Sequence, residues 1–506
     1  MSKIVPSAEA VSLIPDEATI VVSGNSDYLL PDTLLSALEA RFLETGHPRG
    51  LTLTYPVIPG AFRTGTGVDR LAHPGLLRRI IASSYYTLRV KKLMELVKRG
   101  NVEAHVIPMG TLYNLFRATA AGQPGFLTTV GVDTLVDPTI SGQGLMPQSG
   151  TPLAQRIHID GNTFLYYRSL PIDFALIRAT HADVLGNLTF EDEPNTLGAA
   201  YLAAACKQSG GSVIAQVKRV GAAASLPARE VKVPGFLVDQ IVLDPQQQCG
   251  GALPYDPAQT GDIRVPWHTV GKPELGLWQH IILTRAAREL RAGMVANVGF
   301  GLAASLPRIA LEEDRLSSIY FSVEHGPVGG MPLDKTAFGS AINPLALLDS
   351  PFVFDLYNGG LLDITFLGMA QVNASGSVNV SSVRGQINLG GFLDIVHRTP
   401  QIIFCGSFTA GGLAVDRDAE GIRVCQEGVH HRFVADLEHC TFDAHLALQR
   451  GQRVLYITER AVFGLTPSGL ELQEIAPGID LEKDVLAHME FRPRISPQLR
   501  IMSTGD

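Results

Sequence analysis

The chain has 506 residues, of which 45% are hydrophobic, and its 49 acidic and 41 basic side chains give a formal net charge of −8. Because a single hydrophobic core stops growing beyond roughly 250 to 300 residues, we expect two domains. An acidic chain without a basic tract is not expected to bind nucleic acid or a membrane surface, so we expect a small-molecule partner.

The sequence pattern also lacks signals for export and for metal binding. Residues 1–9 have neither a basic region nor an apolar core, and no run of about 18 apolar residues occurs, so we expect a cytoplasmic protein. The five cysteines form no CxxC pair, which favours reduced core thiols over a metal site. These cysteines are Cys206, Cys249, Cys405, Cys425 and Cys440.

The first predicted elements are a buried strand at residues 18–24, which ends in a glycine turn, and a helix at residues 34–42. Asn25 comes directly after that turn, where with Ser26 and Asp27 it is expected to cap the helix. Further strands alternate with helical patterns along the chain. This alternation predicts an α/β fold with mainly parallel sheets covered by helices.

A repeat divides the chain. Residues 171–188 follow a template that returns at residues 362–378, where Asp363 corresponds to Asp173. In each copy a buried strand is followed by a polar glycine turn and a second short strand. Two related, duplicated domains explain such a repeat most simply.

The predicted domains meet at a stretch without periodicity. Residues 244–272 are rich in Pro, Gly and Gln, so we place a linker region there. The N-terminal domain is expected at residues 1–255 and the C-terminal domain at residues 273–506. The second domain opens with a helical face that ends at Leu290, and Gly293 is the expected C-terminal stop.

One carboxylate in the second half has an unusual setting. Residues 321–332 place Glu324 between an apolar strand and a glycine-rich turn. A single Glu held against flexible backbone is typical of a carboxylate nucleophile. The alternative is a solvated Glu at the end of a strand, with the glycines only turning the chain.

Three glycine-bearing turns of the second half, the last at residues 407–412, could converge at one sheet edge, where open α/β sheets bind ligands. Two of them offer candidate contacts. The Asn297 amide and the N–H groups of residues 297–301 could face an oxyanion or a pantetheine amide. Gly390 and Gly391 could let a ligand approach the backbone closely. For both turns, tight packing is the alternative interpretation.

Several motifs in a fixed order match a known family. On them the chain resembles the family I CoA-transferases over nearly its whole length, in particular the single-chain acetate or propionate CoA-transferases, in which two subunit-type halves are fused. The resemblance implies the CoA-transferase fold, with an alpha-subunit-like first domain and a beta-subunit-like second domain. The motifs are residues 70–77, 171–173, 323–332, 405–412, 457–463 and 474–481.

The resemblance implies a ping-pong reaction. The Glu324 carboxylate, expected to be ionised at neutral pH, would attack an acyl-CoA thioester and become a glutamyl-CoA thioester, from which a second carboxylic acid takes the CoA. Coenzyme A is then a substrate, and no permanently bound cofactor is implied. Relatives assemble as dimers or tetramers, so a homodimer or homotetramer is expected. The residues implied to bind the oxyanion or CoA are Asn297, Gly299, Gly301, Gly326, Gly390 and Gly391.

Three positions depart from the family's pattern and form the candidate acyl pocket. Met109 stands where many relatives have a Gln that helps to polarise the acyl carbonyl, and a thioether is only a weak acceptor. His325 replaces a smaller residue after the nucleophile, and Asn25 belongs to a turn that is apolar in relatives. Because of these departures, the resemblance does not identify the natural carboxylic acid substrate.

Two other functions remain as alternatives. An acyl-CoA hydrolase on the same fold needs only that water reaches the acyl-enzyme, although Glu rather than the shorter Asp favours transfer. A catalytically silent CoA-binding or metabolite-binding protein is the second, since related α/β folds also serve as ligand-binding domains. The intact Glu-Gly motif favours an enzyme over the silent protein.

Overall fold

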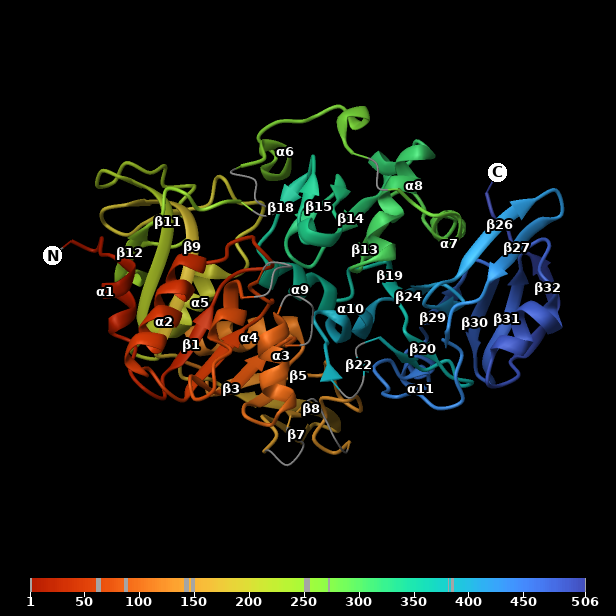
Figure 1. Cartoon of the computed structure of the whole chain (residues 1–506), viewed down its shortest axis with the longest axis horizontal. Coiled ribbons are helices and arrows are strands. Elements are labelled where there is room, and N and C mark those ends of the chain that lie inside the picture. Colours follow the sequence, from red (N-terminus) through yellow and green to blue (C-terminus); the bar gives the residue numbers. More distant parts are fainter. Residues whose placement is uncertain are drawn as a thin grey trace.

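The computed structural model describes residues 2–60, 65–85, 90–140, 145–146, 151–249, 255–271, 274–380, 382–383 and 386–505. It contains two large sheets, one built by the first half of the chain and one by the second (Figure 1). The two chain termini lie on opposite sides of this view. None of the helices within these ranges is long and apolar enough to cross a membrane.

The sheet of the first half runs in the order β12-β11-β9-β1-β2-β3-β4-β6, with β10 beside β9. Neighbours from β12 to β4 are parallel, whereas β6 and β10 are antiparallel to theirs. β9 is buried at nearly every position, as expected for a parallel strand covered on both faces. The bounds are β1 (Thr19–Val22), β2 (Leu51–Tyr55), β3 (Leu77–Ala82), β4 (Glu103–Val106), β6 (Leu145–Met146), β9 (Phe174–Asp183), β10 (Leu188–Thr189), β11 (Ser212–Gly221) and β12 (Gln240–Leu243).

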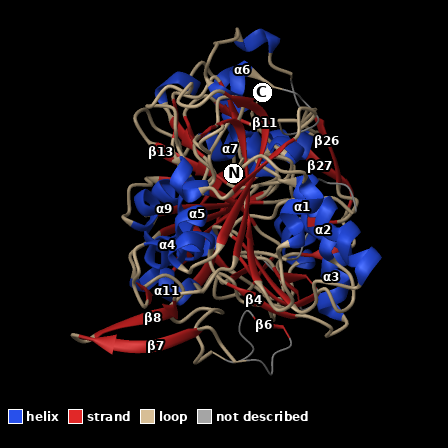
Figure 2. Cartoon of the chain, turned by 90° about the vertical axis from the view of Figure 1, so that its left-hand side faces the viewer, coloured by secondary structure: helices blue, strands red, loops and turns tan. Residues whose placement is uncertain are grey.

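Helices cover both faces of this sheet. Figure 2 shows α1, α2 and α3 on one face and α4 and α5 on the other. A small antiparallel sheet, in the order β5-β8-β7, projects beside them. The bounds are α1 (Ser7–Ser12), α2 (Asp32–Thr45), α3 (Lys91–Lys98), α4 (Met109–Ala120), α5 (Ala199–Gln208), β5 (Gly125–Thr128), β7 (Ala154–Ile159) and β8 (Asn162–Arg168).

The sheet of the second half runs in the order β18-β15-β14-β13-β19-β24-β29-β30-β31-β32. Its middle, from β14 to β29, is parallel, and its ends include antiparallel pairs. The bounds are β13 (Val295–Val298), β14 (Tyr320–Ser322), β15 (Pro327–Val328), β18 (Ala346–Leu347), β19 (Ile364–Gly368), β24 (Gln401–Cys405), β29 (Arg453–Ile457), β30 (Ala461–Thr466), β31 (Gly469–Ile475) and β32 (Arg494–Ile501).

Helices and short two-stranded ribbons surround the second sheet. The helices are α6 (Pro257–Thr260), α7 (Leu277–Ala287), α8 (Leu306–Glu312), α9 (Ser350–Asn358), α10 (Phe392–Arg398) and α11 (Ala444–Gln449). The ribbon strands are β16 (Met331–Pro332), β17 (Ala341–Ile342), β20 (Gln371–Val372), β21 (Val378–Asn379), β22 (Ser382–Val383), β23 (Gln386–Ile387), β25 (Thr409–Ala410), β26 (Ala414–Asp418), β27 (Gly421–Gln426) and β28 (His430–His431).

The repeat seen in the sequence is a repeat of topology. The first sheet contains the parallel set β2-β1-β9-β11 and the second contains β14-β13-β19-β24, each with the buried strand of the repeat, β9 or β19, beside the strand that opens the half. Within the sets, Ile20 pairs with Phe174 and Ala296 pairs with Ile364. The predicted α/β fold with two related, mainly parallel sheets is therefore confirmed.

The two halves meet through helices. α4 of the first half packs against α9 and α10 of the second, and α4 also packs against α5. A small group of buried apolar side chains, here called the joint cluster, fills this contact. Its members are Val57, Met109, Tyr113, Val353, Phe354, Tyr357, Leu362 and Ile395.

Two local predictions are wrong. Asn25 does not cap the following helix: Pro31 is the N-cap residue of α2 and makes no side-chain capping bond, while the Asn25 amide donates to the Phe338 carbonyl. The helix expected to stop at Gly293 already ends at Ala287, because the next N–H groups turn back to carbonyls three residues earlier, as Leu290 does to Ala287.

Other expectations are met only in part. Cys206, Cys249 and Cys405 are buried, but Cys425 and Cys440 are exposed, so the expectation of five core thiols is wrong for these two. Of the predicted linker region, residues 250–254 and 272 lie outside the described residues.

Candidate active site

Glu324 lies directly after β14, on the turn that leads into β15. Ser350 Oγ donates a hydrogen bond of 2.6 Å to the Glu324 carbonyl oxygen. The Gly326 N–H donates to the Val323 carbonyl, which closes the turn. Gly326 has a φ of +138°, and a Cβ there would come within 2.4 Å of the Leu348 carbonyl oxygen. The turn therefore holds the carboxylate in one position.

The Glu324 side chain is buried, with 7% of the residue exposed. Its Oε2 atom has no hydrogen-bond partner among the described residues. Burial raises the pKa of Glu324 to about 7, and its own N–H and the Asn297 amide offset part of the rise. The raised pKa means that Glu324 is less completely ionised at neutral pH than an exposed Glu, which departs from the expectation of an ionised group. The ionised form is poorly solvated, which favours attack.

Asn297, near the end of β13, presents its side-chain amide to the Glu324 carboxyl group. The Thr365 hydroxyl donates to Asn297 Oδ1 at 2.9 Å, which fixes the amide orientation. Asn297 Nδ2 makes two long contacts, 3.3 Å to the Ser322 carbonyl oxygen and 3.4 Å to the Tyr357 hydroxyl, and the amide also hydrogen-bonds to the Glu324 carboxyl group. A donor that already faces the carboxyl group is placed to stabilise an oxyanion formed at Glu324.

The N–H groups of the turn after Asn297 are not free donors. The Gly299 N–H donates to the Phe366 carbonyl at 2.9 Å, as a continuation of the ladder between β13 and β19. The Gly301 N–H points to Asp334 Oδ1 at 3.4 Å. The expectation that the N–H groups of Gly299 and Gly301 face an oxyanion is therefore corrected, because the sheet and Asp334 already use them, whereas the Asn297 side-chain amide faces the Glu324 carboxyl group.

His325 packs against both halves beside the nucleophile. Its Nδ1 lies 4.0 Å from Glu324 Oε1, and its ring meets the Phe338 ring edge-on at 5.5 Å. Asn25 Nδ2 donates to the Phe338 carbonyl at 2.9 Å. A Cβ on Gly339 would lie 2.3 Å from Asn25 Nδ2 and 3.0 Å from the His325 ring. The fold thus brings Asn25 and His325 together.

Phe300 is a neighbour that sequence reasoning missed. It lies in the turn after β13, is 52% exposed, and packs edge-on against the Phe338 ring at 5.4 Å. A line of rings therefore runs from His325 through Phe338 to the surface. The one signal in the sequence was an aromatic residue between Gly299 and Gly301.

Gly390 and Gly391 lie at the start of α10, and Gly390 faces the first half. The Met109 N–H donates to the Gly390 carbonyl at 3.0 Å, and the Gly390 N–H donates to the Ser83 carbonyl at 3.0 Å. A Cβ on Gly390 would lie 3.8 Å from Met109 Cε. A Cβ on Gly391 would lie 3.0 Å from the Phe354 ring. Met109 therefore packs beside Gly390, and Phe354 lies beside Gly391.

The joint cluster connects this group with the group around Glu324. The Tyr357 hydroxyl lies 2.7 Å from Ser322 Oγ, two residues before the nucleophile. The Tyr357 ring packs edge-on against Phe354, which in turn lies against Gly391. The predicted residues of both halves therefore belong to one continuous region.

Asp394, three residues after Gly391, is a residue that sequence reasoning missed. It is fully buried in α10, and its Oδ2 accepts a hydrogen bond of 2.9 Å from the Gly110 N–H of α4. These residues are 284 positions apart, so no local pattern could join them.

Within the described ranges, no group of three His, Cys, Asp or Glu side chains could hold a metal ion.

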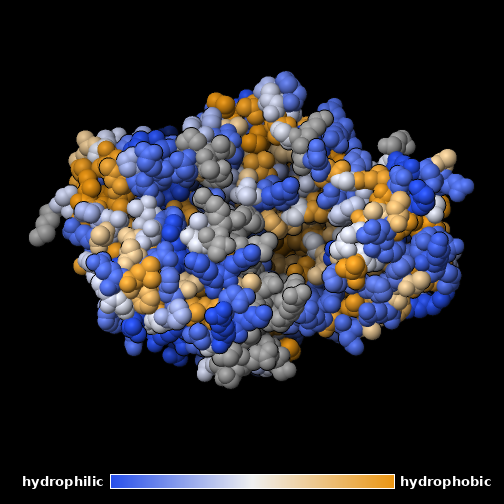
Figure 3. Space-filling view, in the orientation of Figure 1, coloured by the Kyte–Doolittle hydropathy of each residue, from blue (hydrophilic) through white to orange (hydrophobic). Residues whose placement is uncertain are grey.

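The surface is hollowed near this region. Figure 3 shows an apolar hollow near the middle of the molecule, close to the place of α10 in Figure 1.

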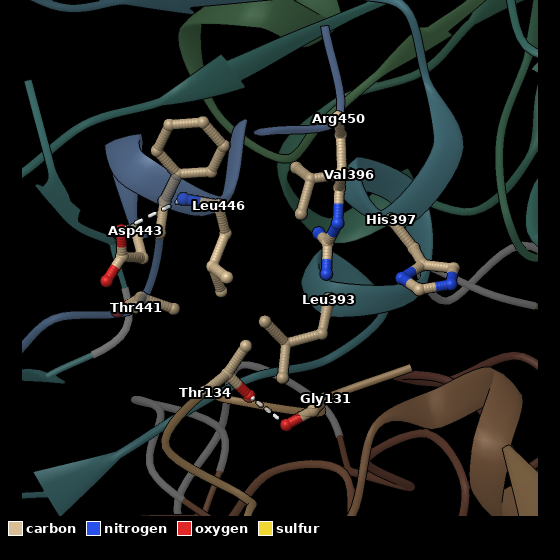
Figure 4. Close-up of a pocket in the computed structure, with 10 residues that line it drawn as sticks. Gly131, Thr134, Leu393, Val396, His397, Thr441, Asp443, Leu446 and Arg450 are labelled. Atoms are coloured by element: carbon tan, nitrogen blue, oxygen red, sulfur yellow. Dashed lines mark hydrogen bonds between the residues drawn. The ribbon is translucent and has the colours of Figure 1, made fainter. Parts of the chain in front are cut away.

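A small cavity is lined by residues that include His397 of α10 and Arg450 (Figure 4). Burial lowers the pKa of His397 to about 4, so that ring is neutral near pH 7. Because no predicted site residue lines this cavity, we give it no part in the reaction.

Comparisons with known proteins match nearly the whole chain. The model of the family described as Coenzyme A transferase matches residues 6–244. The acetate CoA-transferase YdiF of Escherichia coli strain K12 is 39% identical over 98% of this chain and 93% of its own. The caffeate CoA-transferase of Acetobacterium woodii is 36% identical over 100% of this chain and 97% of its own. A crystal structure of the acyl-CoA transferase YdiF of E. coli O157:H7, in a thioester complex with CoA, matches with a TM-score of 0.92 at 37% identity, covering 99% and 95% of the two chains.

Proposed function

The chain belongs to the coenzyme A transferase family and is a CoA-transferase, and from this premise we propose that it moves CoA from an acyl-CoA to a short-chain carboxylic acid through a glutamyl-CoA thioester on Glu324. The observation that carries the proposal is the buried Glu324 carboxylate with an unpaired oxygen. The thioester complex with CoA named for the YdiF structure supports the same chemistry here.

The proposed first half-reaction has two steps. The ionised Glu324 carboxylate attacks the thioester carbonyl of the acyl-CoA, which breaks the carbon–sulfur bond and gives a mixed anhydride and CoA thiolate. The thiolate then attacks the glutamyl carbonyl of the anhydride, which forms the glutamyl-CoA thioester and releases the first acid as its carboxylate. A second carboxylate reverses both steps, and Glu324 is regenerated.

Asn297 has the geometry to assist each addition. Every step passes through a tetrahedral oxyanion next to Glu324, and the Asn297 amide is oriented by Thr365 and faces the Glu324 carboxyl group. A preorganised donor in a dry site stabilises developing charge far better than water does. Gly326, Gly390 and Gly391 are proposed to let CoA lie against the backbone, whereas Gly299 and Gly301 serve to shape the turn.

Burial of the nucleophile favours transfer over hydrolysis. Both the anhydride and the thioester react with water, and a carboxylate that is 7% exposed is shielded from it. The test is to incubate the protein with a short acyl-CoA, with and without an acceptor carboxylate. Transfer predicts a new acyl-CoA and little free acid without the acceptor. Equal acid release in both would indicate a hydrolase, and CoA binding without any exchange would indicate a silent binding protein.

We propose that Met109, His325 and Asn25 line the acyl pocket. Met109 offers apolar packing next to Gly390, and His325 and Asn25 lie beside Glu324. The acids named for the two relatives, acetate and caffeate, differ greatly in size. The natural acid is therefore best found with a panel of acceptor acids.

Shortening His325 is expected to change acid preference. In His325→Ala the ring 4.0 Å from Glu324 is lost, and the space admits one or two further methylenes, so kcat/KM for butyrate relative to acetate should rise about tenfold. The measurement is the ratio of the two values under identical conditions. The exposed His445→Ala serves as control and should leave the ratio unchanged. An unchanged ratio in His325→Ala would remove His325 from the acyl pocket.

Activity is expected to follow the ionisation of Glu324. Burial raises its pKa to about 7, and only the ionised form attacks, so kcat/KM for acyl-CoA should fall about tenfold per pH unit below about pH 7 and level off above it. The measurement is the initial rate from about pH 5.5 to 8.5 at low acyl-CoA. A profile that is flat throughout this range contradicts a buried carboxylate nucleophile.

The cytoplasmic location and the homodimeric or homotetrameric state stay predictions. Size-exclusion chromatography with light scattering tests the assembly directly.

A further inference from the structure

Helix α4 begins without a cap of its own. Its N-cap residue is Pro108, which makes no side-chain capping bond. The first N–H groups of a helix have no partner inside the helix and need one from elsewhere. In α4 the Met109 N–H donates to the Gly390 carbonyl, and the Gly110 N–H donates to Asp394 Oδ2 at 2.9 Å. Both acceptors belong to the second half.

The Asp394 side chain is well suited to accept a hydrogen bond from the N-terminus of α4. It is completely buried, which raises its pKa to about 7, and its carboxyl oxygen faces the positive end of the α4 dipole. Its other oxygen, Oδ1, accepts from Asn358 Nδ2 at 3.2 Å, so the carboxylate is fixed on both sides. Gly110 permits the close approach, because a Cβ there would lie 2.6 Å from Asp394 Oδ1 and 2.7 Å from the Phe354 ring.

Hydrogen bonds to the first half also hold Leu389 and Gly390, which precede Asp394 in the chain. The Leu389 and Gly390 N–H groups both donate to the Ser83 carbonyl, at 3.2 and 3.0 Å. Ser83 follows β3, so the segment sits at the carboxyl edge of the first sheet, where parallel sheets bind ligands. The place of Gly390 relative to Met109 thus depends on contacts with Ser83, Met109 and Gly110.

We propose that Asp394 is a positioning residue, which by capping α4 at Gly110 sets Met109 of the acyl pocket against the Gly390 turn and so shapes the acyl-CoA site that the two halves build together. Asp394 does not touch the substrate in this account. The inference rests on the proposed function, since it takes Gly390 as a CoA contact and Met109 as an acyl contact.

The test compares Asp394→Ala and Asp394→Asn with the wild type. Asp394→Ala leaves the α4 N-terminus uncapped, so KM for acyl-CoA should rise at least about tenfold, with a lower kcat per active site. Asp394→Asn keeps an acceptor for Gly110. The Asn358 amide can turn its Oδ1, which has no hydrogen-bond partner in the described ranges, toward the new amide. This variant should therefore stay within about threefold of wild type.

A matched control removes another contact between the halves. Asp355 of α9 forms a half-exposed ion pair with Arg117 of α4, and exposed pairs add little, so Asp355→Ala should keep KM and kcat within about twofold. Active sites are counted by the amount of CoA bound covalently, which separates inactive protein from altered sites.

A second variant covers the case in which Asp394→Ala does not fold. Gly110→Ala keeps the carboxylate but pushes it from α4, and it should raise KM for acyl-CoA in the same way. Wild-type KM and kcat per titrated site in Asp394→Ala or in Gly110→Ala, or an Asp394→Asn as impaired as Asp394→Ala, would overturn the inference. Failure of the wild type to bind CoA covalently would instead overturn the proposed function.

Discussion

Glu324→Gln is expected to lower kcat by at least about 10⁴-fold, because the amide can form neither the anhydride nor the thioester. The Gln side chain has nearly the same shape, so the turn held by Ser350 and Gly326 should be kept. The measurement is transfer of CoA from acetyl-CoA to an isotopically labelled acid. Retention of more than about a hundredth of wild-type activity would contradict the role of Glu324.

The same variant separates loss of chemistry from loss of fold. The pKa of Glu324 is raised from 4.5 to about 7 in the folded protein, so stability is lost as pH rises through this range and the buried group must ionise. Without that group, Glu324→Gln should be more stable than wild type at about pH 8, by up to about 3 kcal/mol. Denaturant unfolding at about pH 8 and about pH 4 checks the sign, since the difference should nearly vanish at the lower pH, which lies below the unfolded pKa of 4.5.

Gly326→Ala is expected to have the second largest effect. Its φ of +138° is unfavourable for alanine, and the added Cβ would meet the Leu348 carbonyl oxygen at 2.4 Å. The turn must shift, and a displacement of about 1 Å at the nucleophile costs about a hundredfold in kcat/KM. Unfolding free energy should fall by about 1 to 3 kcal/mol.

Gly368→Ala is the matched control for this substitution. Gly368 ends β19 in the same sheet, has no positive φ, and a Cβ there would meet nothing within 4 Å. Its kcat/KM should stay within about twofold of wild type. If Gly326→Ala behaved like Gly368→Ala, the backbone of this turn would not control the nucleophile.

The strand order of each half and the position of Glu324 were predictable, because both follow from local sequence pattern. The repeat of Asp173 at Asp363 reappears as two matching parallel sets, because strand order and hydrophobic period are written into each half separately. The position of Glu324 at the end of a strand was predictable for the same reason.

Contacts between the halves were not predictable. Asn25 follows a glycine and precedes a helix, which is typical of a cap, yet its amide bonds to the Phe338 carbonyl 313 residues away. Asp394 likewise caps a helix from the other half. Gly299 was expected to offer a free N–H, but the β19 ladder extends one residue further and takes it at Phe366. In each case tertiary pairing overrides what the neighbouring residues suggest.

Trapping the covalent intermediate tests the central claim most directly. The protein is incubated with acetyl-CoA without an acceptor, treated with borohydride or hydroxylamine, digested and analysed by mass spectrometry. A glutamyl-CoA thioester predicts that the peptide with Glu324 alone carries the mass change, and that Glu324→Gln shows none. An unmodified Glu324 peptide in a preparation that actively transfers CoA would contradict the account.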